Sequence, residues 1–164
     1  MFRKINEKLT EAGLLKKEWK KSQKYELDYA IRFMKSQHFL SVYNGLISNQ
    51  HVMSKDYVTE LMLKEFFDGT RENWDDFVEH VSGKKCLDIG PSVISPLTGW
   101  DVASTRYVIE PLFEDIDSWQ REKLGRSSFD NLICYAHKGE TLIPDLVDAI
   151  DGAILCRNVL DHTP

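Results

Sequence analysis

The chain has 164 residues, of which 42% are hydrophobic and 29% are charged, and its formal net charge at pH 7 is −5. This length and composition predict one folded domain with an appendage. No apolar run of about 18 residues is present, which argues against a membrane-spanning helix. The first residues, MFRKINEKLTEAG, lack the apolar core of a signal peptide. We therefore expect a cytoplasmic protein with no membrane partner.

Charge is unevenly divided along the chain. Residues 1–82 contain 13 Lys or Arg and 13 Asp or Glu, whereas residues 83–164 contain 8 and 13, so the second half carries the net charge of −5. Within the first half, residues 1–35 alone hold ten basic and five acidic side chains. Such a segment either contacts an anionic partner or forms a solvated helix face.

The first half also carries apolar residues at helical spacing. Three segments show this pattern, which predicts amphipathic helices: Leu27, Ala30, Ile31 and Met34; Val58, Leu61, Met62 and Phe66; Trp74, Phe77, Val78 and Val81. Ser54 and Thr70 are expected N-caps, and Gly69 and Gly83 are expected left-handed C-caps. The letters GLISNQ at 45–50 predict a turn between the first two helices. We expect residues 1–82 to form an N-terminal helical cap region.

From residue 83 onward, short apolar runs alternate with helical patterns. The runs predict four strands, Lys85–Ile89, Arg106–Ile109, Asn131–Tyr135 and Ala153–Cys156. Residues 112–124 predict a crossover helix that ends at Gly125. Its expected inner face consists of Leu112, Ile116, Trp119 and Lys123. The alternation predicts an α/β fold with a doubly wound parallel sheet over residues 83–164.

The three cysteines, Cys86, Cys134 and Cys156, all fall inside predicted strands and lack the spacing of metal ligands. We therefore expect reduced thiols in the core and no metal site.

Acidic residues stand at the ends of the first two predicted strands, which is the edge where open α/β sheets bind ligands. Asp88 lies in the run that ends at Gly90, and Glu110 follows the second run directly. Gly90 allows close approach of the backbone to a ligand. Pro91 has no N–H, Ser92 follows it, and no lysine stands in this turn, so a pyrophosphate is disfavoured. A nucleoside that bears a positive charge fits two carboxylates better, and S-adenosyl-L-methionine has that description.

Three stretches of the chain resemble a known family, the class I (Rossmann-like) S-adenosylmethionine-dependent methyltransferases. CLDIGPS is similar to the family's first motif, YVIEP to its second strand with the ribose-binding acid, and DGAILCRNVLDHTP to its fourth strand and the following turn. The two acids, Asp88 and Glu110, lie 22 residues apart, close to the family's spacing. Ser92 and Ser95 occupy the region where the family motif has further glycines.

The resemblance implies a strand order of 3-2-1-4 in an incomplete Rossmann-like sheet that holds the first four of the family's seven strands. It places the cofactor among Asp88, Gly90, Ser92, Glu110, Ala136, Glu140 and Asn158. It also makes His162 a candidate general base beside the methyl acceptor. Structural alternatives stay open for four of these residues: Asp88 as a helix cap, Glu110 as an exposed loop acid, Glu140 as a solvated loop acid, and His162 as the neighbour of a helix cap.

On this basis we expect an enzyme, a transferase that moves a methyl group from S-adenosyl-L-methionine to a small-molecule acceptor. Nucleic acid is not favoured, because no basic and aromatic pattern appears outside the N-terminal segment. Because three of the family's strands are missing, we expect either a fragment of a longer protein or a partner chain at the edge of the fourth strand, and an isolated fragment should self-associate there. Two other classes remain: a non-catalytic cofactor-binding or scaffold subunit with a degenerate site, and a nucleotide-binding oxidoreductase domain.

Overall fold

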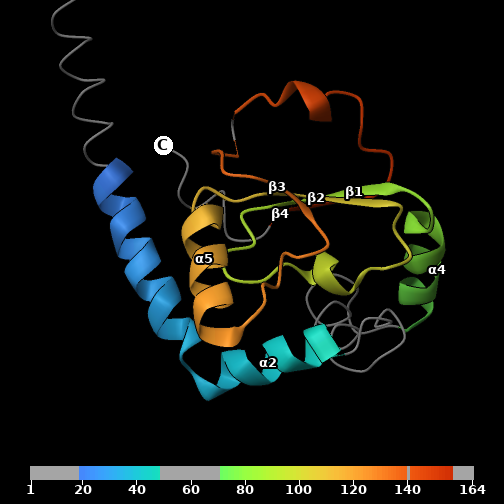
Figure 1. Cartoon of the computed structure of the whole chain (residues 1–164). Coiled ribbons are helices and arrows are strands. Elements are labelled where there is room, and N and C mark those ends of the chain that lie inside the picture. Colours follow the sequence, from blue (N-terminus) through green and yellow to red (C-terminus); the bar gives the residue numbers. More distant parts are fainter. Residues whose placement is uncertain (1–18, 49–70, 140, 157–164) are drawn as a thin grey trace, which may run out of the picture.

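A computed structural model describes residues 19–48, 71–139 and 141–156 of the chain. At its centre is a four-stranded sheet in which every pair of neighbouring strands is parallel, in the order β3-β2-β1-β4 (Figure 1). The strands are β1 Lys85–Ile89, β2 Thr105–Ile109, β3 Ile133–Tyr135 and β4 Ile154–Cys156. The expected α/β fold and strand order are confirmed, and the expected bounds are off by no more than two residues at a strand's start.

Strand register brings the four carboxyl ends to one level. Ile89 pairs with Ile109 on β2 and with Cys156 on β4, and Ile109 pairs in turn with Tyr135 on β3. Each strand therefore ends at the same edge of the sheet. The chain adds β2 and β3 on one side of β1 and then adds β4 on the other side, so the order of strand addition reverses at β1. That position is a topological switch point, where α/β sheets bind their ligands.

Among the described residues, α-helix occurs in only one of the three crossovers. The β2–β3 crossover contains α5, Phe113–Leu124, which ends at Gly125 with φ 81° as expected. The β1–β2 crossover instead holds the short 3-10 helix η2, Pro96–Gly99, and the β3–β4 crossover holds η3, Pro144–Leu146. The sequence predicts strands that alternate with helices, and this is wrong for the β1–β2 crossover, which contains no α-helix. Pro91 and Pro96 lack backbone N–H groups, which disfavours a continuous α-helix in so short a segment.

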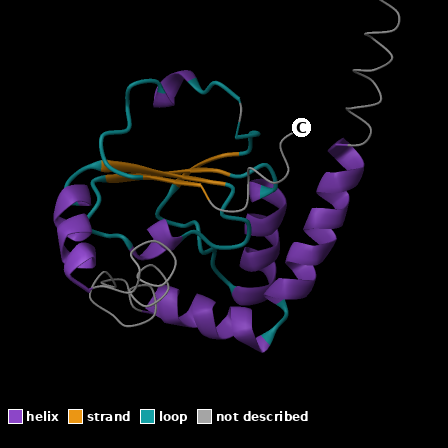
Figure 2. Ribbon diagram, turned by 180° about the vertical axis from the view of Figure 1, so that it is seen from behind, coloured by secondary structure: helices purple, strands orange, loops and turns teal. Residues whose placement is uncertain are grey.

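The two faces of the sheet are covered differently. Figures 1 and 2 show α5, α2 (Gln37–Ser48) and η2 on one face and the loop that carries η3 on the other. On the helical face, Met34, Phe39, Val108 and Ile116 are buried in one apolar cluster. The opposite face is covered by a smaller cluster built on Leu87, Ile109 and Ile143. The helix α4 (Arg71–Val81) packs its Phe77 ring against Trp100, with ring centroids 5.1 Å apart.

The N-terminal region is helical where it is described. Residues 19–34 form a helix, and the predicted apolar face is confirmed by the burial of Ala30 and Met34. The turn expected at 45–50 is wrong, since α2 continues through Gly45 to Ser48. The chain turns at 35–36 instead, where the Ser36 hydroxyl accepts the Phe39 N–H at 3.1 Å. Burial of Leu46 and Ile47 outweighs the turn preference of the letters.

Of the remaining sequence predictions, one is confirmed, one is wrong, and the others lie outside the described residues. Gly83 has φ 70° after α4, which confirms its C-cap position. On α5 the inner face includes Gln120, fully buried, in place of the exposed Lys123, because the amide donates to the Val93 carbonyl and accepts from the Ser128 N–H. The caps expected at Ser54, Gly69 and Thr70 and the helix expected over 58–66 lie outside the described residues.

All three cysteines are free thiols within strands, but they differ in burial. Cys86 is buried, and burial raises the pKa of Cys134 to about 12, so both behave as unreactive core thiols. The expectation of a core position is wrong for Cys156, which is exposed. It lies on β4, which, among the described strands, forms one edge of the sheet and pairs with β1 alone.

Candidate functional site

The turn after β1 has a backbone conformation that favours glycine at two positions. Gly90 has φ 66° and donates its N–H to the Ile109 carbonyl at 2.8 Å, which folds the turn over the end of β2. Ser92 has φ 62°, one of two non-glycine residues with positive φ in the described part of the chain. Its side chain is exposed at the carboxyl edge of the sheet. Ser92 therefore adopts a backbone conformation typical of glycine, in the region where the methyltransferase motif that CLDIGPS resembles has further glycines.

Glu110 is held at the end of β2 by backbone hydrogen bonds. Its own N–H donates to the Tyr135 carbonyl at 3.0 Å, which joins it to the end of β3. Its carboxylate accepts the Ser92 N–H at Oε2, at 2.8 Å, and the Leu112 N–H at Oε1, at 3.1 Å. Only 5% of the residue is exposed. Glu110 thus connects the turn after β1, the end of β2 and the start of the α5 crossover.

The environment of Glu110 makes its negative charge costly. Burial raises the pKa of the carboxyl, the N–H groups of Leu112 and Ser92 lower it, and the nearby acids Glu26 and Asp88 raise it further, with a net upward shift. A cation placed beside these three acids would relieve part of that cost.

Asp88 points away from the solvent edge and organises the β1–β2 crossover. The residue is fully buried, and its Oδ2 accepts the Ser95 hydroxyl at 2.6 Å. The Ser95 oxygen accepts the Leu97 N–H at 3.1 Å, which makes Ser95 the N-cap of η2. Through Ser95, Asp88 therefore supports the cap of a helix, which is close to the structural alternative for this residue. The helix is a 3-10 helix and not an α-helix. Ser95 thus has a structural role, because it links Asp88 to the N-terminus of η2. It lies in the region where the methyltransferase motif often has glycine.

The structure brings four of the predicted cofactor residues into one region, and a fifth to the same edge. Asp88, Gly90, Ser92 and Glu110 surround the ends of β1 and β2, and Ala136 is exposed directly after β3. The remaining predictions, Glu140, Asn158 and His162, lie outside the described residues.

Two features of this edge have no counterpart in the sequence motifs. Glu26, on the helix 19–34, influences the Glu110 carboxyl and accepts the Ser22 hydroxyl at 3.0 Å. At the start of the same helix, the Trp19 ring lies under the Lys138 ammonium, 3.8 Å from the ring centroid. Both interactions link parts of the chain that are distant in sequence, and no sequence motif marks either of them.

Within the described residues, no group of three or more His, Cys, Asp or Glu is arranged to hold a metal ion, and no helix has both the length and the apolar character to cross a membrane. Comparisons with family models, with curated proteins and with solved structures find no match to this chain.

Proposed function

We propose that this chain binds S-adenosyl-L-methionine at the carboxyl edge of its sheet and acts as a methyltransferase on a small-molecule acceptor. The observation that carries the proposal is the meeting of the Gly90–Ser92 turn with the Glu110 carboxylate, joined by the 2.8 Å bond from the Ser92 N–H. A turn with glycine-like backbone and an acid at the neighbouring strand end are the two parts that an adenosyl ligand requires: close backbone approach and an acceptor for ribose hydroxyls.

The residues present fit this ligand once the occupied bonds are considered. A carboxylate has about four acceptor positions, and the Ser92 and Leu112 N–H groups use two of them. Vicinal ribose hydroxyls could take the others, but Glu110 is only 5% exposed. Ribose binding therefore requires the turn at Ser92 to shift and to share or release Oε2.

The same geometry gives little support to the dinucleotide alternative. A pyrophosphate needs several free N–H groups at a helix N-terminus. Here the Gly90 N–H is bonded to Ile109, Pro91 has none, and the Ser92 N–H is bonded to Glu110. Between this turn and β2, the only helix is the short 3-10 helix η2. The oxidoreductase alternative therefore has no observation in its favour.

Charge supports a cationic ligand. S-adenosyl-L-methionine supplies a methyl group already activated on a sulfonium, so the protein's own task is chiefly to align an acceptor with it. The negative charges of Glu26 and Asp88 both raise the pKa of Glu110 at this edge, and the half of the chain that forms the sheet carries the net charge of −5.

One observation favours a second candidate, a non-catalytic scaffold subunit. Both oxygens of Glu110 and one oxygen of Asp88 serve the protein's own backbone or side chains. In a degenerate site these acids would be retained only for stability. The two candidates differ in whether the site binds S-adenosylhomocysteine.

Isothermal titration calorimetry with S-adenosylhomocysteine tests the proposal, with NAD as the comparison ligand. We expect saturable binding of S-adenosylhomocysteine that is weakened by Glu110→Gln, because an amide replaces one acceptor oxygen with a donor. The matched control is Glu122→Gln, an exposed Glu on α5 away from the site, which should leave binding unchanged. No binding by the folded chain favours the scaffold candidate, and a preference for NAD favours the oxidoreductase.

A further inference from the structure

The helix 19–34 presents two different faces. Leu27, Ala30, Ile31 and Met34 pack into the core on one face. Directly opposite, at helical spacings of four, four and three residues, lies a stripe of exposed side chains, which consists of Lys21, Tyr25, Tyr29 and Arg32. The two tyrosines are 69% and 59% exposed. We call this set the tyrosine stripe.

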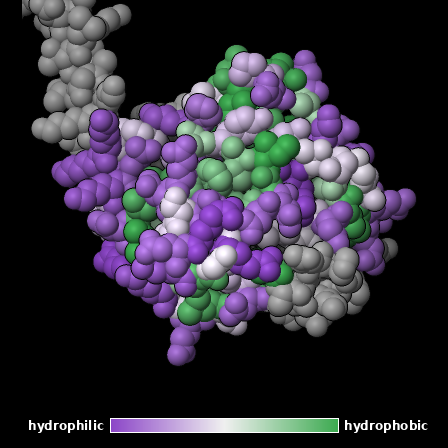
Figure 3. Space-filling model, viewed as in Figure 1, coloured by the Kyte–Doolittle hydropathy of each residue, from purple (hydrophilic) through white to green (hydrophobic). Residues whose placement is uncertain are grey.

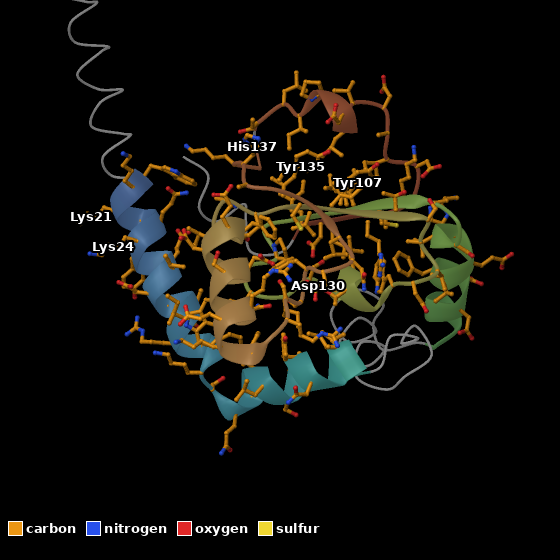
Figure 4. The ribbon with its side chains drawn as sticks, in the orientation of Figure 1. Lys21, Lys24, Tyr107, Asp130, Tyr135 and His137 are labelled. Carbon is orange, nitrogen blue, oxygen red and sulfur yellow. The ribbon has the colours of Figure 1, made fainter. Side chains whose placement is uncertain are left out.

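Basic side chains outnumber acidic ones around the two rings. Residues 19–35 contain five Lys or Arg and two Asp or Glu, in a chain whose net charge is −5. Figure 4 shows Lys21 and Lys24 on the side of the helix that faces away from the sheet, and Figure 3 shows a largely hydrophilic surface there. Arg32 donates Nε to the Asp28 carbonyl at 3.2 Å, which leaves its terminal nitrogens available for another acceptor. The described structure records no ion pair of Lys21 or Lys24.

We propose that the tyrosine stripe binds single-stranded nucleic acid. Proteins bind such strands by stacking bases on exposed aromatic rings while Lys and Arg neutralise the phosphates. Tyr25 and Tyr29 are neighbours on the helix surface, with Cβ atoms about 5–6 Å apart, so they can receive successive bases. Lys21 and Arg32 stand at the two ends of the pair, where the phosphates of the same strand would pass.

Two other anionic partners fit less well. An amphipathic helix enters a lipid surface with its apolar face, but here that face is buried against α5 and α2 through Ala30 and Met34. An acidic protein would use the cations and would gain little from two adjacent exposed rings. Single-stranded nucleic acid uses both the rings and the charges.

The stripe has a fixed position relative to the sheet. The contact of Trp19 with Lys138, at 3.8 Å, holds the start of the helix against the loop that follows β3. The proposal stands on the helix face alone and does not depend on a cofactor site.

Fluorescence anisotropy with a labelled single-stranded RNA of about 12 nucleotides tests the proposal over a range of salt concentrations. Tyr25→Ala combined with Tyr29→Ala keeps every charge and should weaken binding about tenfold or more. Lys21→Gln combined with Arg32→Gln should reduce the slope of log affinity against log salt by about 1.4. The matched controls are Leu142→Ala, which removes another exposed apolar side chain, and Lys123→Gln, which removes an exposed cation on α5. Both controls should bind as the wild type does.

Each of these results would overturn the proposal: no binding of the RNA at low salt, a tyrosine double variant that is folded and binds as tightly as the wild type, or an affinity for polyglutamate equal to that for RNA. Binding to a membrane is measured in parallel with vesicles that contain phosphatidylserine. A higher affinity for these vesicles than for RNA would also overturn the proposal and would assign the tyrosine stripe to lipid instead. Circular dichroism melting of each variant establishes that the fold is intact.

Discussion

The Ser92 N–H donates to the Glu110 carboxylate across 2.8 Å, and this bond ties the turn after β1 to the end of β2. Glu110 also accepts the Leu112 N–H, so a single buried side chain supports two loops. The acid that the sequence singles out for ligand binding is therefore also a structural residue. For a substitution of Glu110, ligand binding and the free energy of unfolding must therefore be measured separately.

Glu110→Ala should lower the free energy of unfolding by about 2–4 kcal/mol, because the buried Leu112 N–H and the part-buried Ser92 N–H lose their acceptor. Glu110→Gln keeps one carbonyl oxygen and should cost less, about 1–2 kcal/mol. Urea denaturation measures both. Glu122→Ala, on the exposed surface of α5, should stay within about 0.5 kcal/mol of the wild type. Equal stability of the Ala variant and the wild type would contradict the structural role.

The stability that depends on Glu110 should vary with pH. Burial raises its pKa above the ordinary value of 4.5, so the folded chain holds a proton at pH values where the unfolded chain has lost it. The contribution of Glu110 to the free energy of unfolding therefore falls as pH rises from about 4.5 to the raised pKa, and it is constant outside that window. Urea denaturation across pH should show the stability of the wild type improving relative to Glu110→Gln as pH is lowered through the window. A difference that does not change with pH, or changes in the opposite direction, would refute this assignment.

Ser92→Gly should keep the fold and stabilise it by up to about 1 kcal/mol. Glycine removes the cost of positive φ, about 1–2 kcal/mol, and this gain exceeds the extra chain entropy of the unfolded state. Thermal denaturation gives the comparison. Ser104→Gly is the matched control, because Ser104 is exposed and has no positive φ, so glycine should destabilise there by about 0.5–1 kcal/mol. If both variants shift equally, Ser92 carries no strain.

Gly152→Ala should destabilise the pairing of β1 with β4 by about 1–3 kcal/mol. A Cβ at this position would lie 2.8 Å from Cys86 Sγ and 3.0 Å from the Lys85 carbonyl, and the backbone atom cannot move aside cheaply. Gly45→Ala is the control, since it lies within α2 with nothing within 4 Å of the new Cβ and should stabilise the helix by about 0.5–1 kcal/mol. Urea denaturation of the two variants should give opposite signs. Matching signs would mean that the packing around Gly152 is different from that described.

Local patterns predict the sheet well because its elements are short and clearly bounded. The run KCLDI is followed by Gly90 and coincides with β1, and the helical spacing before Gly125 coincides with α5. Local patterns do not predict contacts between residues that are distant in sequence. Lys123 was expected to lie on the inner face of α5, yet Gln120 occupies it, because only the folded chain brings the Val93 carbonyl and the Ser128 N–H within reach of its amide.

The candidate site shows the same division. Gly90 and Glu110 can be found from strand ends and turn residues alone. The bond between Ser92 and Glu110 depends on parallel register across 18 positions in sequence, and the approach of Glu26 depends on how the N-terminal helix packs. The sequence also suggested an α-helix after β1, where Pro91, Pro96 and the Asp88–Ser95 relay produce η2.

The most direct test of the central claim follows backbone amide chemical shifts while S-adenosylhomocysteine is titrated into the ¹⁵N-labelled chain. We expect saturable changes at Gly90, Ser92, Glu110 and Ala136, which lie at the carboxyl edge of the sheet, and none at Lys85 and Thr105, which begin β1 and β2 at the opposite edge. Ser92 should change most, because its N–H must share or release Glu110 when a ribose binds. Saturable changes confined to other parts of the chain, or no change at any ligand concentration, would contradict the proposed cofactor site.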